Sequence, residues 1–315
     1  MANSDLNSLI LWANDSSVWR PVEKELAATG TPYEVCEADP TQLLLDRPGS
    51  RVLVADFSLG PERIASLRNN SPATPVVLLF GGSRSDLINN VFSSQGMSHA
   101  LGRNDLVLPH EVIPLTVLSD PDRDPWTLMC QGTNIIFSAQ HWDGSMVGHS
   151  VDQARLVAGS LNTYSDFENY VATSVWELLT NAIYDARRGT DIELPRDVQT
   201  AIPTHQREAR QLVELEIRHD DHKIAVRIKD HLGLLKPSMV LENWRRADAK
   251  SANQIKGDHG GAGVGLYMVL HETAQLVFNI RRGISTEVIF TLPIERSNRS
   301  FIKRVPSIHF FEPRN

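Results

Sequence analysis

The sequence has little cysteine and no long apolar run. Cys36 and Cys130 are the two cysteines among 315 residues, and they lie too far apart to form a C-x-x-C pair. We therefore expect two buried thiols in a reducing compartment, and we exclude a disulfide framework or a zinc ribbon. The longest compact apolar run, Val76–Phe80, is far shorter than the ~20 residues that a membrane helix needs. The sequence thus predicts a protein without a membrane span.

The sequence also has fewer basic residues than acidic ones. Lys and Arg number 31 against 38 Asp and Glu, so the net charge is −7. Because affinity for a phosphate backbone needs a basic face, we expect no nucleic-acid partner. The first eight residues are polar without a basic residue, so no signal peptide is visible and we expect a cytoplasmic protein. The basic stretch at residues 296–314 would cover a neighbouring subunit in a homodimer, bind an acidic partner or pack back on its own domain.

Length and pattern predict two domains. A chain of 315 residues is long enough for two domains of roughly 150 residues, each with its own core. Within residues 9–80, three short apolar runs are separated by helix-like stretches, which is typical of a parallel sheet buried on both faces. Pro and Asp at residues 121–125 indicate a linker. We therefore predict an α/β fold with domains at residues 1–120 and 121–315.

The polar residues that follow these apolar runs are arranged as in response-regulator receiver domains, which the first domain resembles. Asn14 and Asp15 stand where that family has an acidic pair, and Asp56 stands at its phospho-acceptor position. The resemblance implies a flavodoxin-like parallel sheet. Asn14 removes one carboxylate from the Mg²⁺ site, the expected lysine is at best Arg103, and the hydroxyl expected near Phe80 is replaced. We predict a pseudo-receiver used for docking or dimerisation; in the alternative, a plain α/β domain, Asp56 merely ends a strand.

In the second domain, residues 166–188 predict a helix with a polar strip beside its apolar face. Apolar residues recur there at offsets of three and four. Glu177, Asn181 and Asp185 follow one another at offsets of four, so they lie along one side. The amide oxygen of Asn181 suits Mg²⁺, and the carboxylate of Glu177 suits the orientation or deprotonation of a nucleophile. Taken alone, such a strip is more often a solvated helix face.

Two alternating segments, residues 212–217 and 224–230, predict a β-hairpin around the turn at residues 219–222. Asp230 has the same parity as Ile228, so its carboxylate should point toward the covered side of the sheet. Burial there costs free energy unless a group donates a hydrogen bond to the carboxylate. The exocyclic amino group of adenine is such a donor, whereas guanine presents an acceptor. The alternative is a strand-end aspartate that caps the turn.

A glycine-rich segment at residues 260–265 precedes an apolar, helix-like stretch at residues 266–270. Glycines let a backbone approach phosphates closely, and the N-terminus of the following helix presents free N–H groups to anionic oxygens. A dinucleotide-binding motif needs a strand directly before the glycines, but residues 253–259 are polar and loop-like. The sequence also contains no P-loop motif. On its own, the segment is a weak sign of a phosphate site.

Taken in order, these segments and the strand-like residues 286–293 resemble the GHKL ATPase superfamily, which includes histidine kinases and anti-sigma-factor serine kinases. The resemblance covers about residues 125–294. It implies a Bergerat-type α/β sandwich with a mixed sheet, and ATP and Mg²⁺ as cofactors beneath a lid at about residues 238–260. It implies residues for three ligand groups: Mg²⁺ at Asn181, adenine at Asp230 and Gly233, and the phosphates at Gly261, Gly263, Gly265, Leu266 and Lys256.

The adenine motif departs from the family pattern. Where the family has Asp-x-Gly-x-Gly, this chain has Asp230-His-Leu-Gly233-Leu-Leu, which is displaced by one residue and lacks the second glycine. We therefore expect adenine binding to be weakened or reshaped. Residues 189–211 also look inserted between the helix and the hairpin.

The layout of the second domain distinguishes members of the superfamily. A histidine kinase carries a phospho-accepting histidine on a two-helix hairpin, but His110 and His141 leave no room for such helices. The short lead-in to the helix of Asn181 is similar to anti-sigma-factor serine kinases, which phosphorylate a Ser or Thr of a partner protein. By this resemblance Glu177 is the general base of a protein kinase in bacterial-type intracellular signalling. The alternatives are a binding module without turnover, gated by nucleotide or nucleotide-free, and a kinase subunit acting on a separate His-bearing protein.

Overall fold

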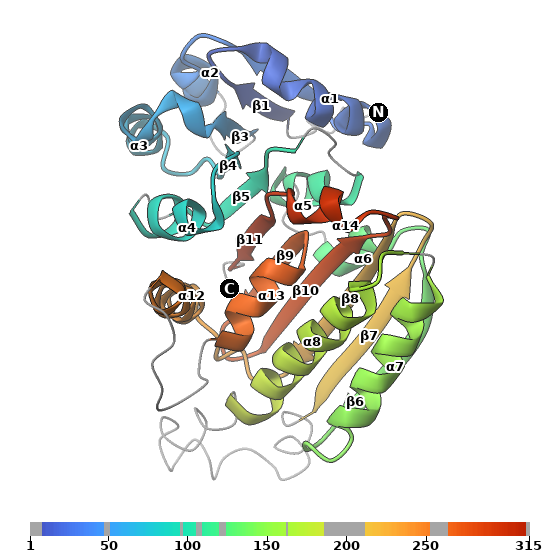
Figure 1. The fold of residues 1–315 in the computed structure, drawn as a ribbon. Helices are drawn as coiled ribbons and strands as arrows, with labels where there is room; N and C mark the ends of the chain where they lie inside the picture. Colours follow the sequence, from blue (N-terminus) through green and yellow to red (C-terminus); the bar gives the residue numbers. More distant parts are fainter. Residues whose placement is uncertain are drawn as a thin grey trace, which may run out of the picture. The chain divides into compact units, whose positions relative to one another are not determined.

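The computed structural model describes residues 8–46, 51–94, 97–104, 109–119, 124–161, 163–185, 212–252 and 264–312 (Figure 1). It is a mixed α/β structure with parallel and antiparallel strand pairs, as the sequence predicts. The chain divides into two compact units: unit 1 contains residues 1–129 and 304–309, and unit 2 contains residues 130–303 and 310–315. The C-terminal stretch therefore contributes to both units. The sequence-based division after residue 120 places this whole stretch in the second domain instead.

Unit 1 has a parallel sheet. Its strands, in the spatial order β2-β1-β3-β4-β5, are β2 (Tyr33–Cys36), β1 (Ser8–Trp12), β3 (Arg51–Asp56), β4 (Val76–Phe80) and β5 (His99–Gly102). Part of β11 (Ser307–Phe311) lies antiparallel to β5, with Ile308 opposite Ala100. The helical segments are η1 (Ser16–Trp19), α1 (Arg20–Thr29), α2 (Thr41–Asp46), η2 (Phe57–Leu59), α3 (Pro61–Asn70), α4 (Arg84–Asp86), η3 (Leu87–Ser94), α5 (Pro109–Ser119) and α6 (Pro125–Met129).

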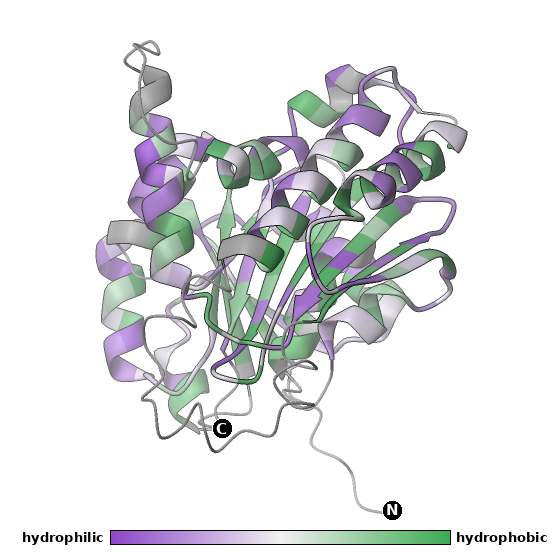
Figure 2. Ribbon diagram, turned by 90° about the horizontal axis from the view of Figure 1, so that it is seen from below, coloured by the Kyte–Doolittle hydropathy of each residue, from purple (hydrophilic) through white to green (hydrophobic). Residues whose placement is uncertain are grey.

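The core of unit 1 follows from strands that are apolar on both faces. One face packs against α1 and α5, and its buried cluster includes Leu11, Val54 and Leu79 from the strands together with Leu26 of α1 and Leu115 of α5. Parallel strands are buried on both sides because their crossover helices cover the sheet. In Figure 2 the strands are mostly green, whereas the helices carry purple residues as well. The predicted parallel sheet in this part of the chain is confirmed.

Unit 2 has antiparallel strands. In the order β9-β10-β8-β7-β6 they are β9 (Gln275–Arg281), β10 (Ser285–Pro293), β8 (Lys223–Asp230), β7 (Val213–His219) and β6 (Asn134–His141). The pairing of β7 with β8 confirms the predicted hairpin. The helical segments are α7 (Val147–Ser160), α8 (Phe167–Thr180), η4 (Asn181–Asp185), α12 (Pro237–Ala252), α13 (Val264–Glu272) and α14 (Asn298–Ile302). Figure 1 shows α7, α8 and α13 side by side over one face of these strands.

The helix α12 occupies much of the expected lid and packs against α13. The indole Nε1 of Trp244 donates a hydrogen bond to the carbonyl oxygen of Leu266 (2.9 Å), and the hydroxyl of Tyr267 donates to Asp248 Oδ1 (3.0 Å). The Trp244 ring is fully buried against Phe278 of β9. Residues 237–252 are therefore a docked helix, and residues 253–260 of the expected lid lie outside the described residues.

The described part of the basic C-terminal stretch packs back on its own chain. In unit 2, Phe301 stacks on Tyr164 with ring centroids 5.8 Å apart, and Phe310 stacks on Phe278 at 4.8 Å. In unit 1, Arg304 is buried beside Glu111. Among the described residues, no helix has the length and apolar character needed to cross a membrane.

Candidate functional site

Asp230 ends β8 on the face that the helices cover. It lies between Val213 of β7 and Thr286 of β10, and the residue is 6% exposed. Its Oδ1 accepts hydrogen bonds from the backbone N–H groups of Leu232 (2.8 Å), Gly233 (3.0 Å) and Thr286 (3.4 Å). Burial raises the pKa of Asp230, and the hydrogen bonds oppose this shift. The predicted orientation is confirmed, and the carboxylate also caps the turn that follows.

Gly233 holds that turn against the β9–β10 hairpin. Its φ is +64°, and an added Cβ would overlap the carbonyl oxygen of Arg281 and lie 2.8 Å from the backbone nitrogen of Gly283. The Gly283 N–H donates a hydrogen bond to the carbonyl oxygen of Gly233 (3.1 Å). A side chain here would meet rigid backbone in a left-handed conformation, so the position requires glycine. The turn beside Asp230 is thereby fixed in place.

The carboxylate of Glu177 on α8 lies against the first turn of α13. A Cβ added at Gly265 would overlap Glu177 Oε2, so the missing side chain makes room for the carboxylate. Unpaired N–H groups give a helix N-terminus a partial positive charge, which favours an anion there. Burial raises the pKa of Glu177. The structure thus brings Glu177 and Gly265 together, two residues that the sequence assigns to one site.

Glu272 is a second carboxylate in the same interface, and the sequence analysis did not single it out. Burial, and then the charge of Glu177, raise the pKa of Glu272 to about 7. Its Oε2 is buried and has no hydrogen-bond partner within the part of the chain that the structure describes. In the sequence, the signal that could have identified Glu272 is its spacing from Gly265. A residue seven positions after Gly265 lies on the same helix face.

Asn181 begins the π-helical turn η4, one turn after Glu177. Its backbone N–H donates to the carbonyl oxygen of Glu177, and its side chain is half-buried. Single π-helical turns are frequent at functional sites. No group of three His, Cys, Asp or Glu side chains that could hold a metal occurs in the described ranges. A metal ion beside Asn181 would therefore take most of its ligands from outside the described His, Cys, Asp and Glu side chains.

The other residues that the sequence assigns to phosphate binding are not all placed by the structure. Gly261, Gly263 and Lys256 lie outside the described residues. Leu266 lies in α13 with its side chain buried, and its carbonyl oxygen accepts the Trp244 hydrogen bond. Leu266 therefore acts in packing the start of α13. The candidate site of unit 2 consists, among the described residues, of Glu177, Asn181, Asp230, Gly233 and Gly265.

In unit 1, guanidinium groups hold the polar residues at the ends of the strands. Asp56 is buried; its Oδ1 accepts from the Ser58 N–H (2.8 Å), and its Oδ2 lies 3.4 Å from Arg103 Nη1. Arg63 Nη1 donates to Asn14 Oδ1 (2.9 Å). Cations thus contact two of the oxygens that a receiver-type Mg²⁺ would need. Arg103, which the sequence offers in place of the expected lysine, thus lies beside the buried carboxylate of Asp56.

A histidine kinase would use His141 or His110 as its phospho-acceptor. His141 is buried, its Nε2 lies 3.0 Å from Ser150 Oγ, and burial lowers its pKa. It therefore serves as a packed, hydrogen-bonded imidazole at the end of β6. His110 lies in α5, and its side chain is outside the described set.

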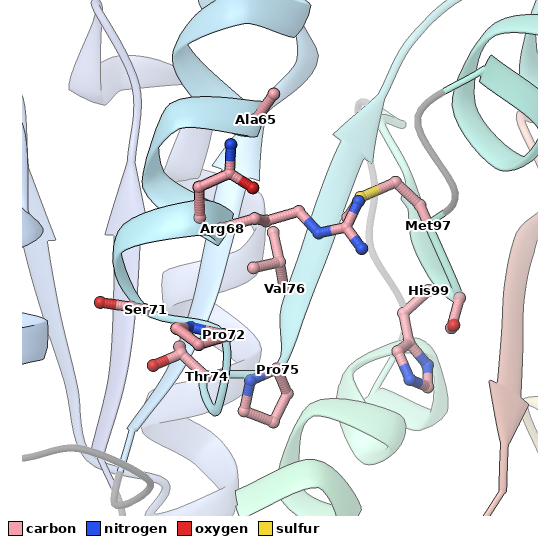
Figure 3. A pocket seen from close by; sticks show the side chains of 11 residues that line it. Ala65, Arg68, Ser71, Pro72, Thr74, Pro75, Val76, Met97 and His99 are labelled. Carbon is pink, nitrogen blue, oxygen red and sulfur yellow. The ribbon is translucent and has the colours of Figure 1, made fainter.

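A cavity of about 480 Å³ lies elsewhere in unit 1. It is lined by the end of α3 and the starts of β4 and β5, and Figure 3 shows the Arg68 side chain reaching across it toward Met97, near His99. None of the predicted site residues lines it. It lies at the amino ends of these strands, whereas ligands of open α/β sheets bind at the carboxyl ends. The cavity therefore lies at the opposite end of the strands from Asp56 and Arg103.

Comparison with protein-family models found no match to this chain, and comparison with curated protein sequences found none.

The two site glycines differ in what surrounds them, so their alanine variants should differ in stability. We expect Gly233→Ala to lower the free energy of unfolding by about 2 kcal/mol or more, because the new Cβ meets backbone at positive φ. Gly265→Ala should stay within about 1 kcal/mol of wild type, because every overlapping atom belongs to the flexible side chain of Glu177 and none to backbone. Urea unfolding measures both values. Equal losses would mean that Glu177 cannot move.

Glu272 should make stability depend on pH. Its pKa is higher in the folded chain than its ordinary value of 4.5, so the folded state binds the proton more tightly and stability falls as pH rises from about 4.5 to about 7. Glu272→Gln should therefore raise the thermal midpoint by about 2 °C or more at pH 8 and change it little at pH 5. The exposed Glu242→Gln on α12 is the control. An equal effect of Glu272→Gln at both pH values would contradict the assignment.

Proposed function

We propose that unit 2 binds ATP with Mg²⁺ and that the protein is a protein kinase of the anti-sigma-factor serine kinase type, acting on a hydroxyl of a partner protein. The observation that carries this proposal is the buried carboxylate of Asp230, held by backbone N–H groups beneath the helices. A carboxylate in that position costs free energy that a bound donor would offset. The order of Glu177, Asn181, Asp230 and Gly265 along the chain supports the same family of sites.

Adenine would contact Oδ2 of Asp230. All three hydrogen bonds from backbone N–H groups go to Oδ1, and the Thr286 side chain also interacts with the carboxylate. Oδ2 would accept from the exocyclic amino group of adenine. Guanine has a carbonyl oxygen at the same place. This oxygen and Oδ2 of Asp230 are both acceptors, so they would repel each other. Gly233 fixes the turn rigidly, so the carboxylate is oriented before a ligand arrives. These contacts support selectivity for adenine over guanine.

The phosphates fit the start of α13. A nine-residue helix begins at Val264, and its N-terminal N–H groups favour anionic oxygens. With no side chain at Gly265, a ligand would approach the backbone there once the Glu177 carboxylate moved aside. Gly261 and Gly263 lie outside the described residues. Glu177 contacts this turn directly, so the carboxylate and the phosphate chain would meet at one place.

Mg²⁺ suits the donor atoms at the same end of α8. Mg²⁺ prefers oxygen ligands and keeps several waters, so one side chain plus phosphate oxygens is a usual set. Asn181 would supply an amide oxygen one turn from Glu177. When bound, the ion neutralises phosphate charge. Glu177, half-buried and with a raised pKa, would accept the proton of the incoming hydroxyl.

Unit 1 fits a docking role. Its strand order β2-β1-β3-β4-β5 is that of flavodoxin-like doubly wound sheets, a group that includes receiver domains. Asp56 contacts Arg103, and Asn14 contacts Arg63, at the end of the sheet where receiver chemistry takes place. We therefore propose a pseudo-receiver that binds a partner or a second copy of the chain in place of phosphoryl transfer.

One observation favours a second function, a nucleotide-gated binding module without turnover. The carboxylate of Glu177 contacts the backbone of Gly265, where it would compete with the phosphates for the helix N-terminus. A carboxylate that stays there cannot act as a base toward a hydroxyl. In this module ATP would change which partner is bound, and no phosphoryl group would move.

Calorimetry with ATP, ADP and GTP in Mg²⁺ tests the proposed site. We expect ATP and ADP to bind and GTP to bind at least about tenfold more weakly, because a hydrogen bond to a charged group contributes about 1.5–3 kcal/mol. Asp230→Asn should weaken ATP by a similar factor. The control is Asp221→Asn, which changes an exposed aspartate in the β7–β8 turn. Equal affinities for ATP and GTP would exclude the assigned adenine contact.

The variant Glu177→Ala separates the kinase from the module. In the kinase, transfer of labelled phosphate from ATP to a partner protein should fall by about 100-fold or more while ATP affinity is retained. Glu168→Ala removes a carboxylate from the same helix and should leave transfer intact. A wild-type protein that binds ATP but transfers no label to Ser or Thr, with partner binding that survives Glu177→Ala, would support the module and refute the kinase.

A further inference from the structure

β6 is the outermost strand of unit 2, and its inner edge pairs with β7. Within the described ranges, no strand pairs with its outer edge. Every residue of β6 except His141 is exposed or half-buried. The backbone N–H and C=O groups along an unpaired strand edge can form hydrogen bonds with a further strand. Unit 2 therefore has an open sheet edge at β6.

This edge lacks the features that commonly prevent strand pairing. Edge strands are often short, or they contain charged residues, proline or a bulge. In unit 1 the edge strand β2 is four residues long and contains Glu34. By contrast, β6 has eight residues and contains no proline, Asp, Glu, Lys or Arg. Its pairing with β7 is irregular only between Ile135 and Phe137, so residues 137–141 form a regular stretch.

Exposed apolar side chains lie at both ends of β6. Ile135 and Ile136, at the start, are 57% and 44% exposed, and Trp142, directly after the strand, is 51% exposed. The exposed residues between them, Ser138 and Gln140, are polar and uncharged. In an antiparallel pair, the start of one strand lies against the end of the other. Two β6 strands paired in this way would bring Ile135 and Ile136 of each copy close to Trp142 of the other.

The absence of charge from β6 suits pairing with a second copy of the chain. In a two-fold symmetric contact the same surface meets itself, so a charged side chain on a self-paired strand comes close to its own copy. Like charges that lie opposite each other destabilise strand pairs. The neighbouring strand β7 contains Glu214, Glu216 and Arg218. In β6 the titratable residue is His141, and burial lowers its pKa, which favours the neutral imidazole.

We propose that two copies of the chain associate through antiparallel pairing of their β6 strands, about a two-fold axis near Ser138. The strands of unit 2 then continue from one copy into the other, and the exposed apolar residues at the two ends of β6 are covered. Asp230, on β8, lies outside this interface, because β7 separates β8 from β6. The proposal does not depend on nucleotide binding by unit 2.

Sedimentation velocity of the full-length protein over a range of concentrations tests the association. We expect the wild type to form a dimer. Ser138→Lys should raise the dissociation constant of the dimer at least about tenfold, because two lysines would face each other near the axis. The matched control is Ser238→Lys, which changes an exposed serine at the start of α12, a helix that contacts β9 on the other side of unit 2. This control should leave the dissociation constant unchanged.

Amide hydrogen exchange of the wild type gives a second measurement that requires no variant. Dilution below the dissociation constant of the dimer should speed the exchange of outward-facing amides in residues 137–141, because these amides lose their partners in the second copy. The amides of β2, the edge strand of unit 1, should exchange at the same rate at every concentration.

Three results would overturn the proposal. The first is a wild-type chain that stays monomeric at about 100 µM, a concentration at which a dimer with a dissociation constant of about 10 µM is the main species. The second is a dimer whose dissociation constant Ser138→Lys leaves unchanged. The third is a dimer whose formation does not slow the exchange of residues 137–141.

Discussion

The buried carboxylate of Asp230 is the constraint on which the arrangement of unit 2 depends. Backbone N–H groups from two distant parts of the chain, residues 232–233 and Thr286, converge on one oxygen atom. This links the register of β8 and β10 to the conformation of the turn after β8. Burial raises the pKa of Asp230 despite these donors. Burying a carboxylate costs free energy that a bound donor would offset, and on this ground we propose a binding role for Asp230.

The interface between α8 and α13 carries a second electrostatic cost. Glu177 and Glu272 repel each other there, and burial disfavours the charge of both. The absence of a side chain at Gly265 leaves room for the Glu177 carboxylate beside the first turn of α13. In the proposed function, phosphates would compete for the same turn and release Glu177 toward the hydroxyl. The electrostatic cost and the proposed chemistry thus concern the same side chain, Glu177.

The local sequence pattern was sufficient to predict much of the fold and part of the candidate site. Alternation placed Asp230 on the covered face of its hairpin, and helical spacing placed Glu177 and Asn181 one turn apart. The meeting of Glu177 with Gly265 is a tertiary contact between segments almost 90 positions apart, so no local period encodes it. Glu272 was missed for the same reason, because only burial beside a second carboxylate distinguishes it from a surface glutamate. The position of Arg304 depends on its contact with Glu111, almost 200 positions earlier in the chain, and composition alone left three alternatives for the basic stretch.

The central claim is that Asp230 and its turn bind adenine. The most direct measurement follows the amide NMR signals of Leu232 and Gly233, which donate to Asp230 Oδ1, as nucleotide is added with Mg²⁺. The account predicts that ATP and ADP shift both signals to saturation and that GTP at the same concentrations leaves them in place. Signals that ATP does not move, in a protein whose other amides show it to be folded, would contradict the account.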